Sequence, residues 1–205
     1  MKGLFISFEG IDGCGKSTQI DLLAKHFSRL KKPIVKTEEP GGTAGANEIR
    51  KILLRENNFQ WSVETEALLF MAARNDHVEK VIKPSLKENK IVICDRFMDS
   101  TLVYQGMRSP NAKQLSLTLF ELIAINPDIT FLIDMEPEIA LNRALSRSTG
   151  EDRFENYGIN FQHELRKNFL DIAYKHSDRI KIINGNKSPE DVAAQINESI
   201  KTLAL

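Results

Sequence analysis

The sequence is poor in cysteine and has no excess of charge of either sign. Its 205 residues include two cysteines, Cys14 and Cys94, which lie far apart and form no Cys-x-x-Cys pair. The sequence therefore predicts neither a disulfide framework nor a thiolate zinc site. Neither cysteine is followed six residues later by arginine, which excludes the thiolate loop of a phosphatase.

Lys+Arg and Asp+Glu both number 28. That balance disfavours a dedicated nucleic-acid binder and leaves local anion sites possible.

Long apolar runs are also missing. The longest, residues 67–73, is far shorter than the roughly 20 residues that cross a bilayer. The apolar run near the N-terminus stops at Glu9 and is too short for a signal peptide. We therefore expect a cytoplasmic protein that has no membrane partner.

Short apolar segments alternate with longer segments of helical periodicity. Such alternation is typical of parallel strands joined by crossover helices. The strand segments are nearly continuous apolar runs, as expected where helices cover both faces of a sheet. They are residues 4–8, 34–37, 91–95, 129–134 and 180–184. The pattern predicts an α/β fold with a doubly wound five-stranded parallel sheet, in a single domain over residues 1–205.

A polar segment at residues 147–158 interrupts this pattern. It reads RSTGEDRFENYG and carries Arg147, Arg153 and two glycines between two helical segments. One interpretation is a solvated surface loop. The other is a lid that closes over an anion, since lids are polar, hinged segments that carry charges.

The strongest motif is Gly10-x-x-x-x-Gly15-Lys16-Ser17, which follows the first predicted strand and opens the first helix. Its glycines allow backbone N–H groups to turn toward phosphate oxygens, and the helix N-terminus adds positive potential. The lysine reaches the β and γ phosphates of a nucleotide, and the Ser17 hydroxyl can bind Mg²⁺. The motif therefore predicts binding of a nucleoside triphosphate. The predicted ATP-binding residues are Gly10, Ile11, Asp12, Gly13, Cys14, Gly15, Lys16, Ser17 and Thr18.

The remaining motifs disfavour a GTPase. The nearest match to the guanine-reading Asn-Lys-x-Asp is Asn186-Lys187-Ser188-Pro189, which has proline in place of the aspartate. The strand at 91–95 ends in Asp95, the form expected of a carboxylate that helps to hold Mg²⁺. Arg96 follows directly, so one strand end offers a metal-facing carboxylate and a phosphate-binding guanidinium.

The sequence from residue 5 to about residue 194 resembles the thymidylate kinase family, bacterial type. The separate motifs that carry the resemblance are FEGIDGCGKST at 8–18, TEEPGGT at 37–43, LLFMAARNDH at 68–77, DRFMDSTLVYQG at 95–106, LIDMEPEIALNRALSR at 132–147 and DRFE at 152–155. The family implies a P-loop nucleoside monophosphate kinase fold with a lid at about 147–158. It also implies transfer of the γ-phosphoryl group of Mg-ATP to dTMP, giving dTDP for dTTP biosynthesis, in a homodimer.

The resemblance also implies roles for individual residues. Phe70 would stack on thymine, Arg74 would hydrogen-bond the base, and Tyr104 would lie near the sugar, where a ribose 2′-hydroxyl would project. Arg96 would bind the acceptor phosphate with Asp12 nearby. The other residues of the substrate site would be Glu39, Ser100, Thr101 and Gln105. From the residues alone, Phe70 also fits a core position on an apolar helix.

The residues that the resemblance implies for ATP, the phosphate donor, follow the pattern of the bacterial members of the family. Residues 11–14 contain no arginine, whereas eukaryotic-type members carry one there. By resemblance Arg147 and Arg153 would stabilise the transferred phosphoryl group from the lid, and Arg143 would lie over the adenine. A solvated helix position is the alternative for Arg143.

One departure limits the resemblance. Glu38 stands where the family usually has arginine, which reverses the charge near the acceptor site. Two other functions remain possible from the motifs alone: a kinase for another nucleoside monophosphate, and a non-enzymatic P-loop switch. The switch needs no acceptor pocket, so Arg74, Arg96 and Gln105 speak against it.

Overall fold

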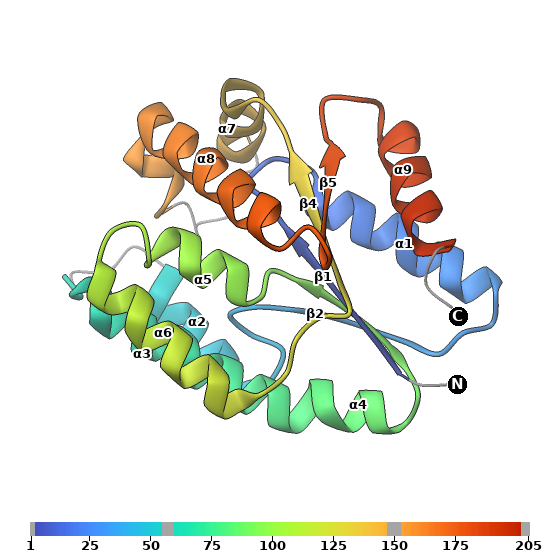
Figure 1. Cartoon of the computed structure of the whole chain (residues 1–205), viewed down its shortest axis with the longest axis horizontal. Coiled ribbons are helices and arrows are strands. Elements are labelled where there is room, and N and C mark those ends of the chain that lie inside the picture. The colour runs from blue at the N-terminus through green and yellow to red at the C-terminus, as the bar shows by residue number, and fades with distance from the viewer. Residues whose placement is uncertain (1–2, 55–59, 147–152, 202–205) are drawn as a thin grey trace.

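In the computed structural model, residues 3–54, 60–146 and 153–201 are described (Figure 1). They form one five-stranded sheet in the order β2-β3-β1-β4-β5, and every neighbouring pair is parallel. The strands are β1 (Leu4–Glu9), β2 (Ile34–Glu38), β3 (Ile91–Asp95), β4 (Ile129–Asp134) and β5 (Ile180–Asn184). The predicted doubly wound parallel sheet is confirmed, and three of the five predicted strands have the predicted bounds.

Helices cover both faces of the sheet (Figure 1). They are α1 (Lys16–Arg29), α2 (Ala44–Leu54), α3 (Val63–His77), α4 (Lys83–Lys87), α5 (Met98–Tyr104), α6 (Pro110–Ile123), α7 (Pro137–Leu145), α8 (Ile159–Lys175) and α9 (Pro189–Lys201). A π-helical turn, Val78–Ile82, joins α3 to α4, and a 3-10 turn, Glu155–Tyr157, precedes α8.

Burial explains which strands are central. All six residues of β1 are buried, whereas β2 at the edge alternates between half-buried and exposed positions. Successive side chains of β1 point to opposite faces. Ile6 and Phe8 join a core cluster with Phe27 of α1, while Phe5 joins a second cluster with Met71 of α3. Two apolar faces on one strand require a helical layer on each side.

The carboxyl ends of β1, β2 and β3 lie level with one another. Asp95 is in register with both Phe8 and Glu38. The backbone N–H of Arg96 donates to the Phe8 carbonyl at 2.9 Å, and that of Glu39 donates to the Asp95 carbonyl at 2.9 Å. Loops that follow these strands therefore meet at one edge of the sheet, which is where ligands bind in open α/β folds.

Of the predicted lid, residues 147–152 lie outside the described residues, and 153–158 contain the 3-10 turn. The described helices include none that is long and apolar enough to span a bilayer.

Candidate functional site

The glycine-rich loop between β1 and α1 wraps around the side chain of Lys16. The Lys16 ammonium donates to the carbonyls of Gly10 at 3.0 Å and Ile11 at 3.1 Å. Gly13 has φ +84°, and a Cβ there would lie 1.8 Å from the Ala140 carbonyl oxygen. Glycine at this position therefore lets the loop pack directly on α7. The result is a lysine held at the start of a helix, with its charge inside the loop.

Ser17 and Asp95 come together beside the loop. The Ser17 hydroxyl donates to Asp95 Oδ2 at 3.2 Å. Asp95 Oδ1 is buried and has no hydrogen-bond partner among the described residues. A buried carboxylate oxygen without a donor is costly, so this atom fits a cation ligand. Mg²⁺ is usually held by one or two carboxylates together with waters and phosphates, and this pair suits that pattern.

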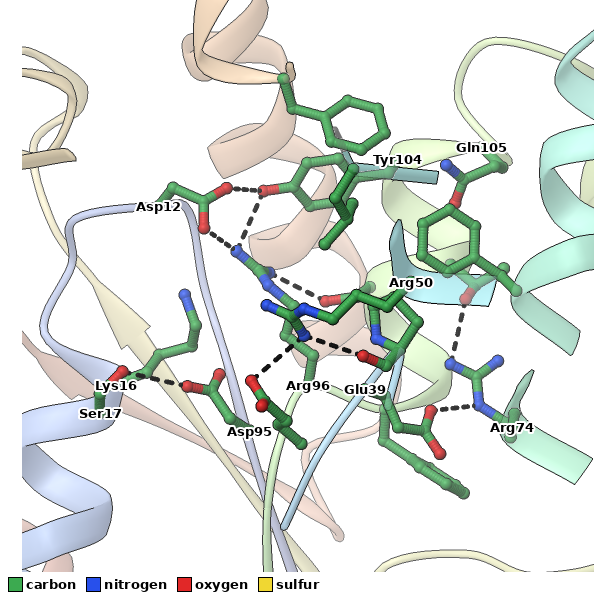
Figure 2. Close-up of a pocket in the computed structure, with 18 of the residues that line it drawn as sticks. Asp12, Lys16, Ser17, Glu39, Arg50, Arg74, Asp95, Arg96, Tyr104 and Gln105 are labelled. Atoms are coloured by element: carbon green, nitrogen blue, oxygen red, sulfur yellow. Dashed lines mark hydrogen bonds and ion pairs between the residues drawn. The ribbon is translucent and has the colours of Figure 1, made fainter. Parts of the chain in front are cut away.

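Arg96 lies at the centre of the site (Figure 2). Its backbone adopts φ +65°, which turns the chain sharply at the end of β3. The guanidinium donates to Asp12 Oδ1 at 2.6 Å, to the Gly10 carbonyl at 2.9 Å and to Ser100 Oγ at 3.0 Å. The Tyr104 hydroxyl donates to Asp12 Oδ2 at 2.9 Å. Arg96 thereby joins the glycine-rich loop to α5.

The charge state of Asp12 follows from these contacts. Burial alone would raise the pKa of its carboxyl, but Arg96 and Lys16 together hold that pKa well below the usual range. Asp12 is therefore an anion that keeps the Arg96 side chain extended toward the glycine-rich loop.

A second carboxylate, Glu9, supports Arg96 from beneath. It is buried at the end of β1 and accepts from the backbone N–H of Phe97 at 2.8 Å and the Ser100 hydroxyl at 2.5 Å. Burial and the nearby charge of Asp99 raise its pKa to about 7, against the opposing effects of Ser100 and Arg96. Sequence reasoning missed Glu9, because a glutamate at the end of a strand usually faces solvent.

Arg74 of α3 lines the same pocket as Arg96 and the glycine-rich loop. Its Nε donates to Glu39 Oε2 at 2.6 Å, and its Nη2 donates to Thr101 Oγ1 at 3.1 Å. Nη1 faces the sulfur atoms of Met71 and Met98, which are weak acceptors. The Nη1 group of this buried arginine is therefore available to a ligand that offers a stronger acceptor than sulfur.

The pocket has a volume of about 270 Å³. The predicted site residues that line it are Asp12, Gly13, Gly15, Lys16, Ser17, Glu39, Phe70, Arg74, Asp95, Arg96, Ser100, Thr101, Tyr104 and Gln105. They come from α1, α3 and α5 and from three strand ends, so the structure brings together residues that lie up to 93 positions apart in the chain (residues 12 to 105).

Glu38 also lines the pocket and is paired with Arg50 of α2. The two side chains approach at 3.1 Å, and Arg50 Nη1 donates to the Pro40 carbonyl at 2.8 Å. Sequence reasoning missed Arg50, because an arginine on an amphipathic helix commonly faces solvent. The charge reversal at residue 38 is thus accompanied by a guanidinium at the same edge of the pocket (Figure 2).

Arg143 and Arg153 do not line this pocket. Arg153 pairs with Glu66 of α3 and donates to the Leu53 carbonyl at 3.0 Å, so it does not reach the glycine-rich loop. Arg143 of α7 is exposed, and its Nη1 lies 3.5 Å from the Met135 sulfur. Arg147 lies outside the described residues.

Comparison with known proteins is consistent across three sources. The family model described as Thymidylate kinase matches residues 8–196. A thymidylate kinase of Ruegeria pomeroyi is 48% identical to this chain, covering 98% of the chain and 95% of the relative. One from Dinoroseobacter shibae is 50% identical, covering 95% and 94%. The crystal structure of thymidylate kinase from Ehrlichia chaffeensis superimposes with a TM-score of 0.79 at 34% identity, covering 98% of this chain and 100% of that one.

The raised pKa of Glu9 predicts a pH dependence of stability. The folded pKa of about 7 exceeds the ordinary value of 4.5, so folded protein binds more protons than unfolded protein between these values. The contribution to stability is full below pH 4.5 and is lost as the pH rises through 7. At about 1.4 kcal/mol per pKa unit, wild type should lose about 2 to 3 kcal/mol relative to Glu9→Gln between pH 5 and pH 8. Urea unfolding at both pH values measures this difference. Parallel pH profiles would mean that Glu9 is ionised throughout.

Proposed function

The chain belongs to the thymidylate kinase family, whose members use ATP to phosphorylate dTMP to dTDP, and we propose how its residues carry out that reaction. The observation that carries the proposal is the position of Arg96. Its guanidinium donates to the Gly10 carbonyl of the glycine-rich loop. It also lines the pocket that Arg74 lines. A donor phosphate held by the loop and an acceptor phosphate in the pocket would meet at this group.

Phosphoryl transfer asks the protein mainly to align two nucleotides and to stabilise charge on the transferred group. Lys16 binds the β and γ phosphates of ATP, and Arg96 binds the acceptor phosphate. Asp12 holds Arg96 in place by the 2.6 Å contact and thereby orients its donors before substrate arrives. Substrate phosphates would replace the backbone carbonyls that Lys16 and Arg96 now contact.

The acceptor base occupies the pocket beside Arg74 and Phe70. Stacking on an aromatic ring suits any planar base, so specificity requires polar contacts. Arg74 Nη1 donates to a carbonyl oxygen of thymine, and Gln105 supplies a further polar contact. Glu39 keeps Arg74 in position with Thr101, while Ser100 supports Arg96.

Mg²⁺ is part of this proposal, with Ser17 and Asp95 as its protein ligands. When bound, the ion would reduce the negative charge of the transferred phosphates. The buried and unpartnered Asp95 Oδ1 supports the assignment.

The lid and the adenine contact remain proposals that rest on the family. Closure of residues 147–158 would bring Arg147 to the transferred phosphoryl group, and Arg143 would lie over the adenine. Arg153 would have to leave Glu66 to take the same role.

The free, buried thiols of Cys14 and Cys94 fit a reducing compartment, so a cytoplasmic location belongs to the proposal as well. Cell fractionation would test it.

A coupled assay of ADP release tests the function directly. Purified protein with Mg-ATP is offered dTMP, dUMP, UMP, CMP, GMP and AMP in turn, and Lys16→Ala serves as the matched inactive enzyme. We expect turnover with dTMP to exceed that with UMP, CMP, GMP and AMP by far. Equal turnover with one of these four, or retention of more than about a tenth of the activity in folded Lys16→Ala, would contradict the proposed roles.

Glu38 generates a prediction about the acceptor phosphate. Glu38→Gln removes a negative charge from the pocket edge and releases Arg50 for the phosphate, so the KM for dTMP should fall by about 2- to 5-fold. The effect should shrink as salt is added, because ions screen exposed charges. The control is Glu48→Gln, which removes a charge paired with Lys51 on α2. A KM that is unchanged at every ionic strength would place Glu38 and Arg50 outside substrate binding.

Tyr104 generates a prediction about the sugar. Its ring is buried and lies edge-on to Phe154 at 5.1 Å, and crowding by such a ring rejects an added hydroxyl by about 10²-fold in kcat/KM. Tyr104→Phe keeps the ring and should keep the preference for dTMP over its ribo counterpart. Tyr104→Ala should lose most of it. Folding of each variant is checked by circular dichroism, and a folded Tyr104→Ala that discriminates as wild type does would assign sugar recognition to another group.

A homodimer is the last part of the proposal. Leu68 of α3 is 48% exposed and Leu122 of α6 is 78% exposed, and the two helices lie side by side (Figure 1). Apolar side chains on neighbouring helices are suited to a second copy of the chain. Light scattering at micromolar concentration should give about twice the 23.2 kDa chain mass. A monomer mass would refute the dimer.

A further inference from the structure

Glu66 of α3 is a buried carboxylate to which the reaction described above gives no role. Its side chain is fully buried and accepts from two arginines that come from different segments. Arg108, between α5 and α6, donates to Oε2 at 2.7 Å, and Arg153, before the 3-10 turn, donates to Oε1. A buried carboxylate needs such partners, and losing one of them leaves an uncompensated charge.

Aromatic rings extend this cluster toward the acceptor pocket. The Arg153 guanidinium lies over the ring of Phe154 at 5.3 Å, and Phe154 packs against Tyr104 and lines the pocket. Arg108 lies over Tyr157 at 5.7 Å. Glu66 therefore ties residues 153–157 to the wall that carries the proposed sugar contact.

Glu66 also bears on the orientation of Gln105. The Gln105 Nε2 lies 3.5 Å from Glu66 Oε2. Both carboxylate oxygens of Glu66 accept from arginines, so the amide nitrogen of Gln105, and not its oxygen, faces Glu66. The amide oxygen of this pocket-lining residue is then left for the ligand (Figure 2). An acceptor at this position matches the N3–H of thymine and opposes cytosine, whose N3 is itself an acceptor.

We propose that Glu66 is a positioning residue of the acceptor site: it holds Arg153 and residues 153–157 against Tyr104, and it presents the Gln105 oxygen to the base. Arg153 accordingly acts through Glu66 and does not contact the transferred phosphoryl group. This inference rests on the acceptor-site assignments of Gln105 and Tyr104 made above.

The test compares Glu66→Gln and Arg153→Gln with Glu64→Gln. Glu64 lies on the same helix and accepts from Ser109, and within the described part of the chain none of its hydrogen bonds involves Gln105 or residues 153–157. In steady-state assays, Glu66→Gln and Arg153→Gln should each raise the KM for dTMP about 10-fold or more. The KM for ATP should stay within about 2-fold of wild type, and Glu64→Gln should match wild type in both. Because the two residues act as a unit, the double variant should be no worse than Glu66→Gln alone.

Base discrimination separates the two parts of the proposal. A glutamine at position 66 can donate to Gln105, which allows the Gln105 amide to turn its nitrogen toward the pocket. The ratio of kcat/KM for dTMP over dCMP should therefore fall about 10-fold in Glu66→Gln and remain unchanged in Arg153→Gln. If Glu66→Gln fails to fold, the KM for dTMP is compared between Glu64→Gln and the variants Arg108→Gln and Arg153→Gln.

Two results would overturn the proposal. A KM for dTMP in folded Glu66→Gln equal to that of Glu64→Gln would remove the positioning role. A loss of kcat at unchanged KM in Arg153→Gln would return Arg153 to the transferred phosphoryl group. Gln105→Leu distinguishes these failures from a wrong site assignment: if it leaves the ratio for dTMP over dCMP unchanged, Gln105 does not contact the base.

Discussion

The ion pair between Arg96 and Asp12 is the contact on which the geometry of the site depends. It joins a side chain at the end of β3 to the glycine-rich loop after β1, two strands that are neighbours in the sheet. Parallel pairing brings both strand ends to the same edge, and the left-handed backbone of Arg96 turns its side chain back toward the loop. Glu9 then fixes the start of α5 through Phe97 and Ser100. The proposed donor and acceptor sites consequently share one wall.

Three arginines at or near the pocket, one buried and two half-buried, each pair with a carboxylate. Arg96 pairs with Asp12, Arg74 with Glu39, and Arg153 with Glu66. Removing such charges from water is costly, and each pair recovers that cost only through close hydrogen bonds. In return the guanidinium groups are held in fixed orientations before any nucleotide arrives, which is the condition for electrostatic stabilisation of developing charge. The same pairing makes single substitutions here more damaging than the loss of an exposed ion pair.

The fold was largely predictable from the sequence, because strands covered on both faces are continuous apolar runs. The strands Ile91–Asp95, Ile129–Asp134 and Ile180–Asn184 were predicted with the observed bounds. The glycine-rich loop and Asp95 could also be placed, since the loop follows one predicted strand and Asp95 ends another.

Glu9, Arg50 and Glu66 could not be found in this way. Each is a single charged residue on an ordinary strand or helix, and the sequence pattern does not distinguish a charged side chain that is buried or paired from one on a solvated face.

By itself the sequence determined the order of strands and helices, the glycine-rich loop and, through its motifs, the family to which the chain belongs. Only the tertiary structure decided which charges meet: Glu38 with Arg50, and Arg153 with Glu66, a residue 87 positions earlier in the chain. The physical reason is the separation along the chain over which each kind of interaction acts. Apolar periodicity and turn geometry act between near neighbours and leave a signature in the sequence. An ion pair forms between whichever opposite charges the packed sheet and helices bring within hydrogen-bonding distance, and that depends on the whole fold.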